Sequence, residues 1–117
     1  MTDVQPLPMP LRRVGTVPAE FEADLLENLC FQLGTTLEST GAHEAYQTLA
    51  VTVRDRLAAR RARTAAAHHE ANPRFVYYLS AEYMLGRQLE QNLLYSGTRD
   101  TADQPGCTDS VGAIWGE

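Results

Sequence analysis

A glutamate and an arginine near the middle of the chain stand in a sequence context typical of enzyme active sites. They are Glu82 and Arg87, in the stretch RFVYYLSAEYMLGRQLEQNLL at residues 74–94. The pattern predicts a buried strand, an abrupt turn that carries Glu82, and a helix with Arg87 near its start. From these residues alone, the ordinary alternatives are an acid at a helix N-terminus for Glu82 and a structural ion pair for Arg87.

The basic residues exclude one class of chemistry. All ten of them are arginine, and the chain contains no lysine. A Schiff base to a carbonyl substrate or cofactor requires a lysine amine. The side chains of these 117 residues therefore cannot form one.

Two other groups of residues suggest sites that we consider weaker. His68 and His69 are adjacent on a predicted helix, so their side chains diverge by about 100°, which suits one metal ion poorly. We predict no metal site and read both as solvated cations at a helix end. Clustered arginines are the electrostatic signature of nucleic-acid binders. Here they spread around the helix and the net charge is -5, so we expect no nucleic-acid partner; the five arginines are Arg54, Arg56, Arg60, Arg61 and Arg63.

The composition is that of a soluble globular domain. The hydrophobic fraction is 44% and the charged fraction 21%, and 117 residues can form one domain at most. The N-terminus has three prolines and no basic start followed by an apolar run, so it does not resemble a signal peptide. No stretch approaches the roughly 20 apolar residues of a membrane span. We therefore expect a cytoplasmic protein with no membrane partner.

Two long helices are predicted before residue 72. The first starts near Thr16–Pro18, with Thr16 or a neighbour as cap and proline in the first turn. Its apolar stripe recurs at steps of four, at Phe21, Leu25, Leu29, Leu33 and Leu37. The second runs from about Ala42 to Ala71, and its later half, rich in alanine and arginine, loses most of the apolar stripe and should project from the core or pack on a partner. Its inner face should carry Tyr46, Leu49, Ala50, Val53 and Leu57.

The segment that follows predicts a strand without partners. Asn72 and Pro73 should end the second helix, because a residue that precedes proline is pushed out of the helical region. The continuous apolar run Phe75–Leu79 is typical of a strand covered on both faces in a parallel sheet. No other segment resembles a strand that could pair with it, so the rest of the sheet must lie elsewhere. A third helix is expected at about Met84–Tyr95.

Specific motifs in this region resemble the α-glucan (glycogen, starch, maltodextrin) phosphorylase family. They are the block YYLSxExxxGRxLxxNLL at residues 77–94, TVRD at Thr52–Asp55, RxRT at Arg61–Thr64, and NP followed by a basic residue at 72–74. The likeness covers roughly residues 19–98. After about Asp100 the sequence no longer looks like the family, so we expect a truncated or frame-shifted chain.

The resemblance implies a fold class and a division of the chain. Family members fold as two Rossmann-like halves around a cleft. We therefore expect a mostly α fragment, with three helices and one isolated buried strand, of that α/β two-Rossmann-half glycosyltransferase fold. The expected segments are a flexible N-terminal arm at 1–18, a phosphorylase-like helical region with the first sheet strand at 19–98, and an unrelated or disordered tail at 99–117.

The resemblance also implies chemistry for the parent protein. Family members are homodimers that use inorganic phosphate to release glucose 1-phosphate from α-1,4-glucans, with pyridoxal phosphate on a lysine far toward the C-terminus. Glu82, Gly86 and Arg87 match residues that line the family's cofactor and sugar cleft. This chain itself should contain no catalytic residue and no cofactor-binding residue.

One further position is implied for regulation. In the animal enzymes the end of the second helix helps to form a nucleotide-effector site. The positions that match this site are occupied here by Arg61, Ala65, Ala66 and His69, which differ from the residues of those enzymes. Of the residues that form the site, only Arg63 therefore remains. Effector control by AMP is therefore not expected.

Three functions follow as hypotheses. The first is a phosphorylase fragment that is inactive alone. The second is a helical interaction module that docks on a full-length phosphorylase. The third is an arginine-rich nucleic-acid binder.

Overall fold

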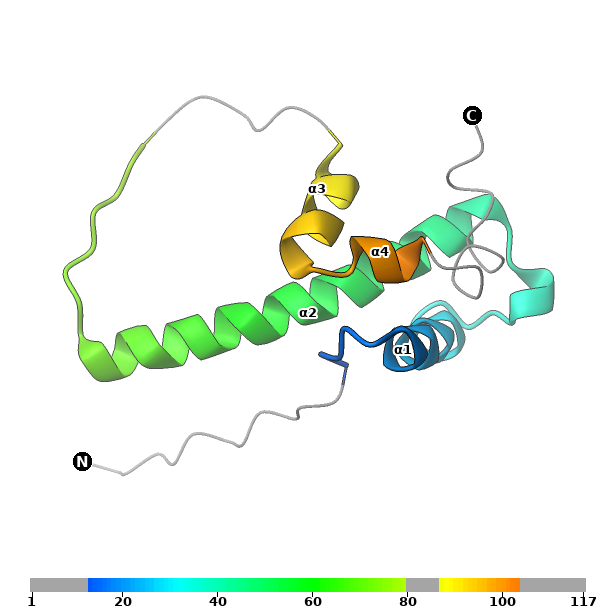
Figure 1. Cartoon of the computed structure of the whole chain (residues 1–117), viewed down its shortest axis with the longest axis horizontal. Coiled ribbons are helices and arrows are strands. Elements are labelled where there is room, and N and C mark those ends of the chain that lie inside the picture. Colours follow the sequence, from blue (N-terminus) through cyan, green and yellow to red (C-terminus); the bar gives the residue numbers. More distant parts are fainter. Residues whose placement is uncertain (1–12, 80–86, 104–117) are drawn as a thin grey trace.

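The computed structural model describes residues 13–79 and 87–103. This part of the chain is helical (Figure 1), and the elements are α1 (Pro18–Phe31), the 3-10 turn η1 (Leu37–Ser39), α2 (Ala42–Ala71), α3 (Gln88–Ser96) and α4 (Arg99–Ala102). None of these helices is long and apolar enough to cross a membrane.

Helix α1 begins where the sequence predicts, but it ends before the last two leucines of the predicted apolar stripe. Pro18 occupies the first helical turn, as expected, but Val17 is the N-cap and no side chain caps the helix. The helix stops at Phe31 because Gly34 adopts the left-handed conformation with φ of 66°, and its N–H bonds the Cys30 carbonyl at 3.2 Å. The prediction that Leu33 and Leu37 extend the same stripe was therefore wrong.

Helix α2 has the predicted bounds. Its N-terminus is tied by the Glu44 carboxylate, which accepts the Gly41 N–H at 3.1 Å. Its end is set by Asn72, which is left-handed with φ of 43° and precedes Pro73. The prediction that Asn72 and Pro73 end the helix is confirmed.

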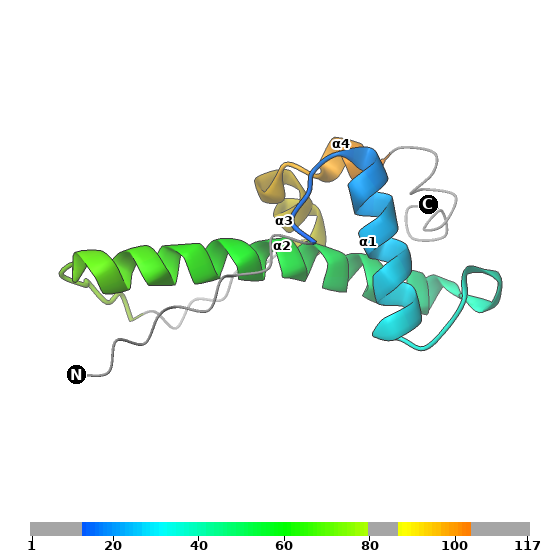
Figure 2. The same cartoon turned by 90° about the horizontal axis from the view of Figure 1, so that it is seen from below.

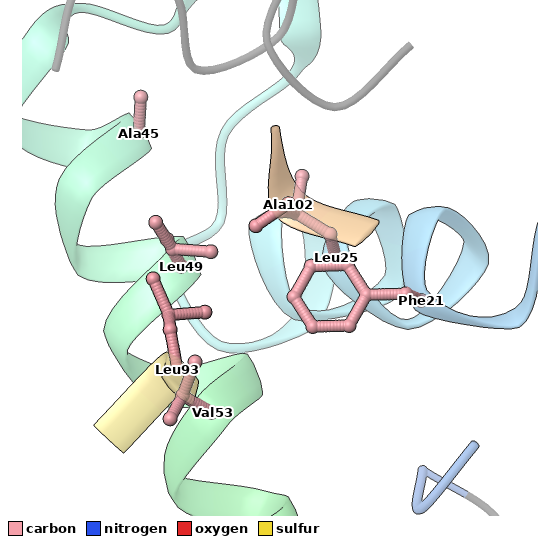
Figure 3. Packing of buried hydrophobic residues seen from close by; sticks show 7 residues of the cluster. All are labelled: Phe21, Leu25, Ala45, Leu49, Val53, Leu93 and Ala102. Atoms are coloured by element: carbon pink, nitrogen blue, oxygen red, sulfur yellow. The ribbon is translucent and has the colours of Figure 1, made fainter. Parts of the chain in front are cut away.

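The core lies where α1, α3 and α4 meet the first half of α2. Helix α1 crosses α2, and the short helices pack beside the crossing (Figure 2). Figure 3 shows the apolar side chains that converge there, namely Phe21, Leu25, Ala45, Leu49, Val53, Leu93 and Ala102. Leu49 and Val53 confirm the predicted inner face, whereas Tyr46 is exposed.

The second half of α2 projects from this core, as predicted. Every residue from 61 to 71 is exposed. Figure 1 shows this half running away from the other helices. Its helical state therefore depends on the alanine and arginine propensity of the segment and on the continuity of α2 rather than on burial.

The predicted isolated buried strand was wrong. Phe75–Leu79 has no regular secondary structure, and its side chains are between 56% and 96% exposed. Within residues 13–79 and 87–103 there is no strand. A strand forms only when a neighbour takes its backbone hydrogen bonds, and the described helices offer no such edge.

This exposure makes a substitution within the segment harmless to the helical unit. Val76→Lys should change the free energy of unfolding by less than about 0.5 kcal/mol, because surface changes rarely exceed that value. Urea unfolding followed by circular dichroism measures this. Val53→Lys, at a buried position of α2, is the control that should unfold the chain. A loss of several kcal/mol with Val76→Lys would mean that the segment is buried within this chain.

Helix α4 lies inside the range that the sequence assigns to the tail. Thr101 and Ala102 are buried, and Ala102 belongs to the core cluster. The unit around the core therefore extends to residue 102. The three-segment division of the chain stays a prediction.

Candidate functional site

The predicted cleft residues fall at the edge of the described structure. Glu82 and Gly86 lie outside the described residues. Arg87 is exposed and directly precedes α3, where its carbonyl accepts the Gln91 N–H at 3.1 Å. Arg87 is the N-cap residue of α3, so it lies near a helix start as the sequence predicts, although α3 spans Gln88–Ser96 rather than the expected 84–95. Its proposed role in a cleft depends on residues outside the described helices.

A shallow hollow lies between α2 and α3, and its walls include Gln88, which follows Arg87 in the sequence. Its volume is about 270 Å³, and its walls are Tyr46, Ala50, Val53, Arg54, Leu57, Gln88, Leu89 and Asn92. Half of these residues are aliphatic, and Arg54 supplies a guanidinium that contacts Asp55 at 3.2 Å. The hollow can accept a small apolar group, but none of the described residues that line it is a carboxylate, an imidazole or a thiol that could act as a general base.

The predicted effector remnant lies on the projecting half of α2. Arg63 is exposed, as are Arg61, Ala65, Ala66 and His69. His68 is also exposed, and its ring lies 5.4 Å from that of Phe75. Among the described residues, no three histidine, cysteine or acidic side chains gather as metal ligands would.

The arginines of α2 have different environments. Arg60 is fully engaged at the end of α3, where it donates to the carbonyl oxygens of Tyr95 at 2.8 Å and Ser96 at 2.7 Å. These carbonyls belong to the last turn of α3, which has no helical partners for them. Arg56 is buried, whereas Arg61 and Arg63 are exposed. The five arginines therefore do not form one surface.

The most constrained polar group is the Arg56 guanidinium, which sequence reasoning missed. It is 3% exposed and donates three hydrogen bonds, to the Gly15 carbonyl at 2.9 Å, the Thr52 carbonyl at 3.0 Å and the Asp24 carboxylate at 2.9 Å. Its central carbon also lies 4.4 Å from the centre of the Phe21 ring. Arg56 thereby joins α1, α2 and the segment before α1.

A second polar cluster lies on the same side of α2. The buried Asn28 amide donates to Thr52 and to Asp55, each at 3.1 Å, and its oxygen accepts from Arg13 at 3.2 Å. Arg13 also pairs with Glu27 at 3.2 Å. All buried side-chain polar atoms of the described residues have partners, so this cluster is fully satisfied.

The pKa values of Arg56 and Arg13 are shifted in opposite directions. Burial lowers the pKa of Arg56, and the Asp24 carboxylate partly offsets this effect. The hydrogen bond to Glu27 raises the pKa of Arg13. An arginine keeps its charge in proteins, so both groups act as fixed cations that hold α1 against α2.

A signal for this network exists in the sequence. Thr48, Thr52 and Arg56 follow one another at steps of four and lie on the buried side of α2. Polar residues that share the face of an apolar stripe require buried partners. Those partners, Asn28 and Asp24, lie on a different helix, so the sequence pattern does not identify them.

Comparison with known proteins finds several glycogen phosphorylases that are similar to this chain. Residues of this chain are 33% identical over 86 residues to the brain form of glycogen phosphorylase from Bos taurus, which covers 74% of this chain and 10% of that protein. The liver form from Homo sapiens gives the same identity and coverage. Glycogen phosphorylase from Synechocystis sp. is 34% identical over 92 residues, covering 79% of this chain and 11% of that protein.

Two other comparisons found no match. No protein-family model matches the chain, and no solved structure matches it. The chain spans about a tenth of the length of the curated relatives it matches. Over about three quarters of its residues this chain is similar to animal and cyanobacterial glycogen phosphorylases, which confirms its resemblance to a fragment of the α-glucan phosphorylase family.

Proposed function

We propose that this chain is part of an α-1,4-glucan (glycogen) phosphorylase, whose whole reaction is the phosphorolysis of α-glucan to glucose 1-phosphate. The observation that supports this proposal is the similarity to glycogen phosphorylases over 74% of the chain. The parent protein would act in carbohydrate metabolism in the cytoplasm, as a homodimer.

The role of this chain in the parent follows from the same resemblance. Its helical unit would support one wall of the active-site cleft, and Glu82, Gly86 and Arg87 would line that wall. Arg87 lies at the start of α3, and Gln88, which follows it, lines the hollow between α2 and α3. The core around Phe21 and Leu49 would hold α3 in place without taking part in chemistry.

The residues present do not fit the family's cofactor. Pyridoxal phosphate is held through a lysine amine, and the chain has ten arginines and no lysine. No step that needs a lysine-bound cofactor can therefore be assigned to side chains of these 117 residues. We expect the chain alone to be inactive.

A direct assay tests this expectation. The purified chain, given glycogen, phosphate and pyridoxal phosphate, should release no glucose 1-phosphate, while the human liver enzyme under the same conditions releases it. A Glu82→Gln variant should give the same background as the unmodified chain. Measurable turnover that Glu82→Gln abolishes would refute the inactive-fragment proposal.

The exposed surface supports a second candidate, a module that docks on a full-length phosphorylase. Phe75–Leu79 is an exposed apolar segment of a kind that soluble monomers rarely leave open. Co-purification of the chain with a full-length enzyme would support this candidate. The matched variant is Val76→Lys, which should weaken binding and leave the helical unit folded. Binding that is equally strong with both chains would exclude the segment as the docking surface.

A further inference from the structure

Residues 13–16, which precede the N-cap residue Val17 of α1, contact three different helices. The Arg13 side chain pairs with Glu27 and donates to Asn28 on α1, and it lies 3.8 Å from Asp55 on α2. The next fastening is the Gly15 carbonyl, which accepts from Arg56 on α2 at 2.9 Å. In Figures 1 and 2 this segment lies beside α2 just before α1 begins.

The last fastening comes from the far end of the described chain. The Thr101 hydroxyl on α4 donates to the Thr16 carbonyl at 3.0 Å, across 85 positions of sequence. Thr101 is 7% exposed, so water cannot readily replace this bond. Thr16 itself is exposed, so its carbonyl bonds Thr101 while α4 stays in place and can bond water once α4 moves away.

Helix α4 is itself held at both ends. At its start the hydroxyls of Ser96 and Thr98 are 2.6 Å apart, and Arg99 pairs with Glu90 of α3 at 3.0 Å. At its end the Ala102 side chain packs in the core beside Phe21 and Leu25 (Figure 3). The position of the Thr101 hydroxyl is thus set by α3 and by the core.

We propose that residues 13–16 form a strap that α4 holds closed, so that the position of the strap and the position of α4 are coupled. Displacing α4 removes the Thr101 partner of Thr16 and leaves the strap held only by the contacts of Arg13 and Gly15, so that its open form becomes more populated. By thermodynamic reciprocity, releasing the strap also loosens α4. Any partner that binds one of these two segments in its free form then changes the accessibility of the other.

Trypsin reports how often the strap is open in the full chain. It cleaves after arginine, and the Arg13 side chain is available only when it leaves Glu27 and Asn28. The Arg74–Phe75 bond, in an exposed non-helical segment, is the reference within the same molecule. Cleavage at Arg13–Val14 should be slower than at Arg74–Phe75, because it follows the population of the open strap.

Substitutions at Thr101 should change the ratio of the cleavage rate at Arg13–Val14 to the cleavage rate at Arg74–Phe75. Thr101→Val removes the hydroxyl at nearly constant volume and should raise cleavage at Arg13–Val14 about fivefold, which corresponds to one net hydrogen bond of about 1 kcal/mol. Thr101→Ser keeps the hydroxyl and should retain slow cleavage. Asp100→Ala, at an exposed position of the same helix, is the control that should leave the ratio unchanged.

Two results would overturn the proposal. One is equal cleavage at Arg13–Val14 in the valine and serine variants, which would show that the hydroxyl does not hold the strap. The other comes from the reverse experiment, in which Arg13→Ala frees the strap from α1. Amide hydrogen exchange at Ala102, whose N–H bonds the Thr98 carbonyl at 2.9 Å, should then become faster, and unchanged exchange would disprove the coupling.

Discussion

Arg56→Met is expected to destabilise the helical unit by about 3–5 kcal/mol, the range observed when one partner of a buried ion pair is removed. Methionine replaces the unbranched apolar stem of arginine but supplies none of the three hydrogen bonds that the guanidinium donates. It leaves the Asp24 carboxylate, which is 14% exposed at the side chain, without its cation. Because small domains are stable by only about 5–15 kcal/mol, the variant should be largely unfolded in mild urea. Equilibrium urea unfolding by circular dichroism measures the change.

Two matched variants separate the buried pair from a general effect of charge. Arg54→Met removes a guanidinium from an exposed position two residues earlier and should change the stability by less than about 0.5 kcal/mol. The double change Arg56→Met with Asp24→Leu replaces both charges by apolar groups and should recover much of the loss. If Arg56→Met and Arg54→Met have equal effects, Arg56 is not buried in solution.

Phe21→Ala is expected to cost about 3–5 kcal/mol, because it empties the centre of the core. Phe21 is 0% exposed, and its ring lies against Leu25 and Ala102 (Figure 3). The ring also carries the Arg56 guanidinium on its face. Urea unfolding should show a lower midpoint with an unchanged slope.

The matched control lies on the same helix. Phe31 is 75% exposed, so Phe31→Ala removes the same side chain without opening a cavity and should change the stability by less than about 0.5 kcal/mol. Because Phe21 and Arg56 touch, the two losses should not add in a Phe21→Ala, Arg56→Met chain. Equal effects of Phe21→Ala and Phe31→Ala would contradict the described packing of α1 on α2.

The sequence alone predicts the elements whose signals are local. The bounds of α2 follow from Asn72 and Pro73 at its end and from continuous helix propensity before them. The start of α1 follows from Pro18 in the first turn. The resemblance to glycogen phosphorylases rests on motifs within single segments, such as residues 77–94, and the comparisons confirm it.

The candidate site was only partly predictable. Arg87 stands at the start of a helix, as its sequence context predicts, while Glu82 and Gly86 lie outside the described residues. The hollow between α2 and α3 was not predictable, because it needs the two helices to meet at residues far apart in sequence. Its walls depend on packing between helices rather than on any local pattern.

Tertiary contacts decided the remaining features. The apolar run Phe75–Leu79 carries a pattern of burial, but burial requires a partner, and the described helices provide none, so the segment is exposed. Arg56, one of five arginines that look alike in the sequence, is buried because Asp24 and the Gly15 carbonyl meet it from other segments. A local pattern thus determined where this protein forms helices, whereas contacts between distant residues determined which side chains are buried, because burial depends on what packs against a residue.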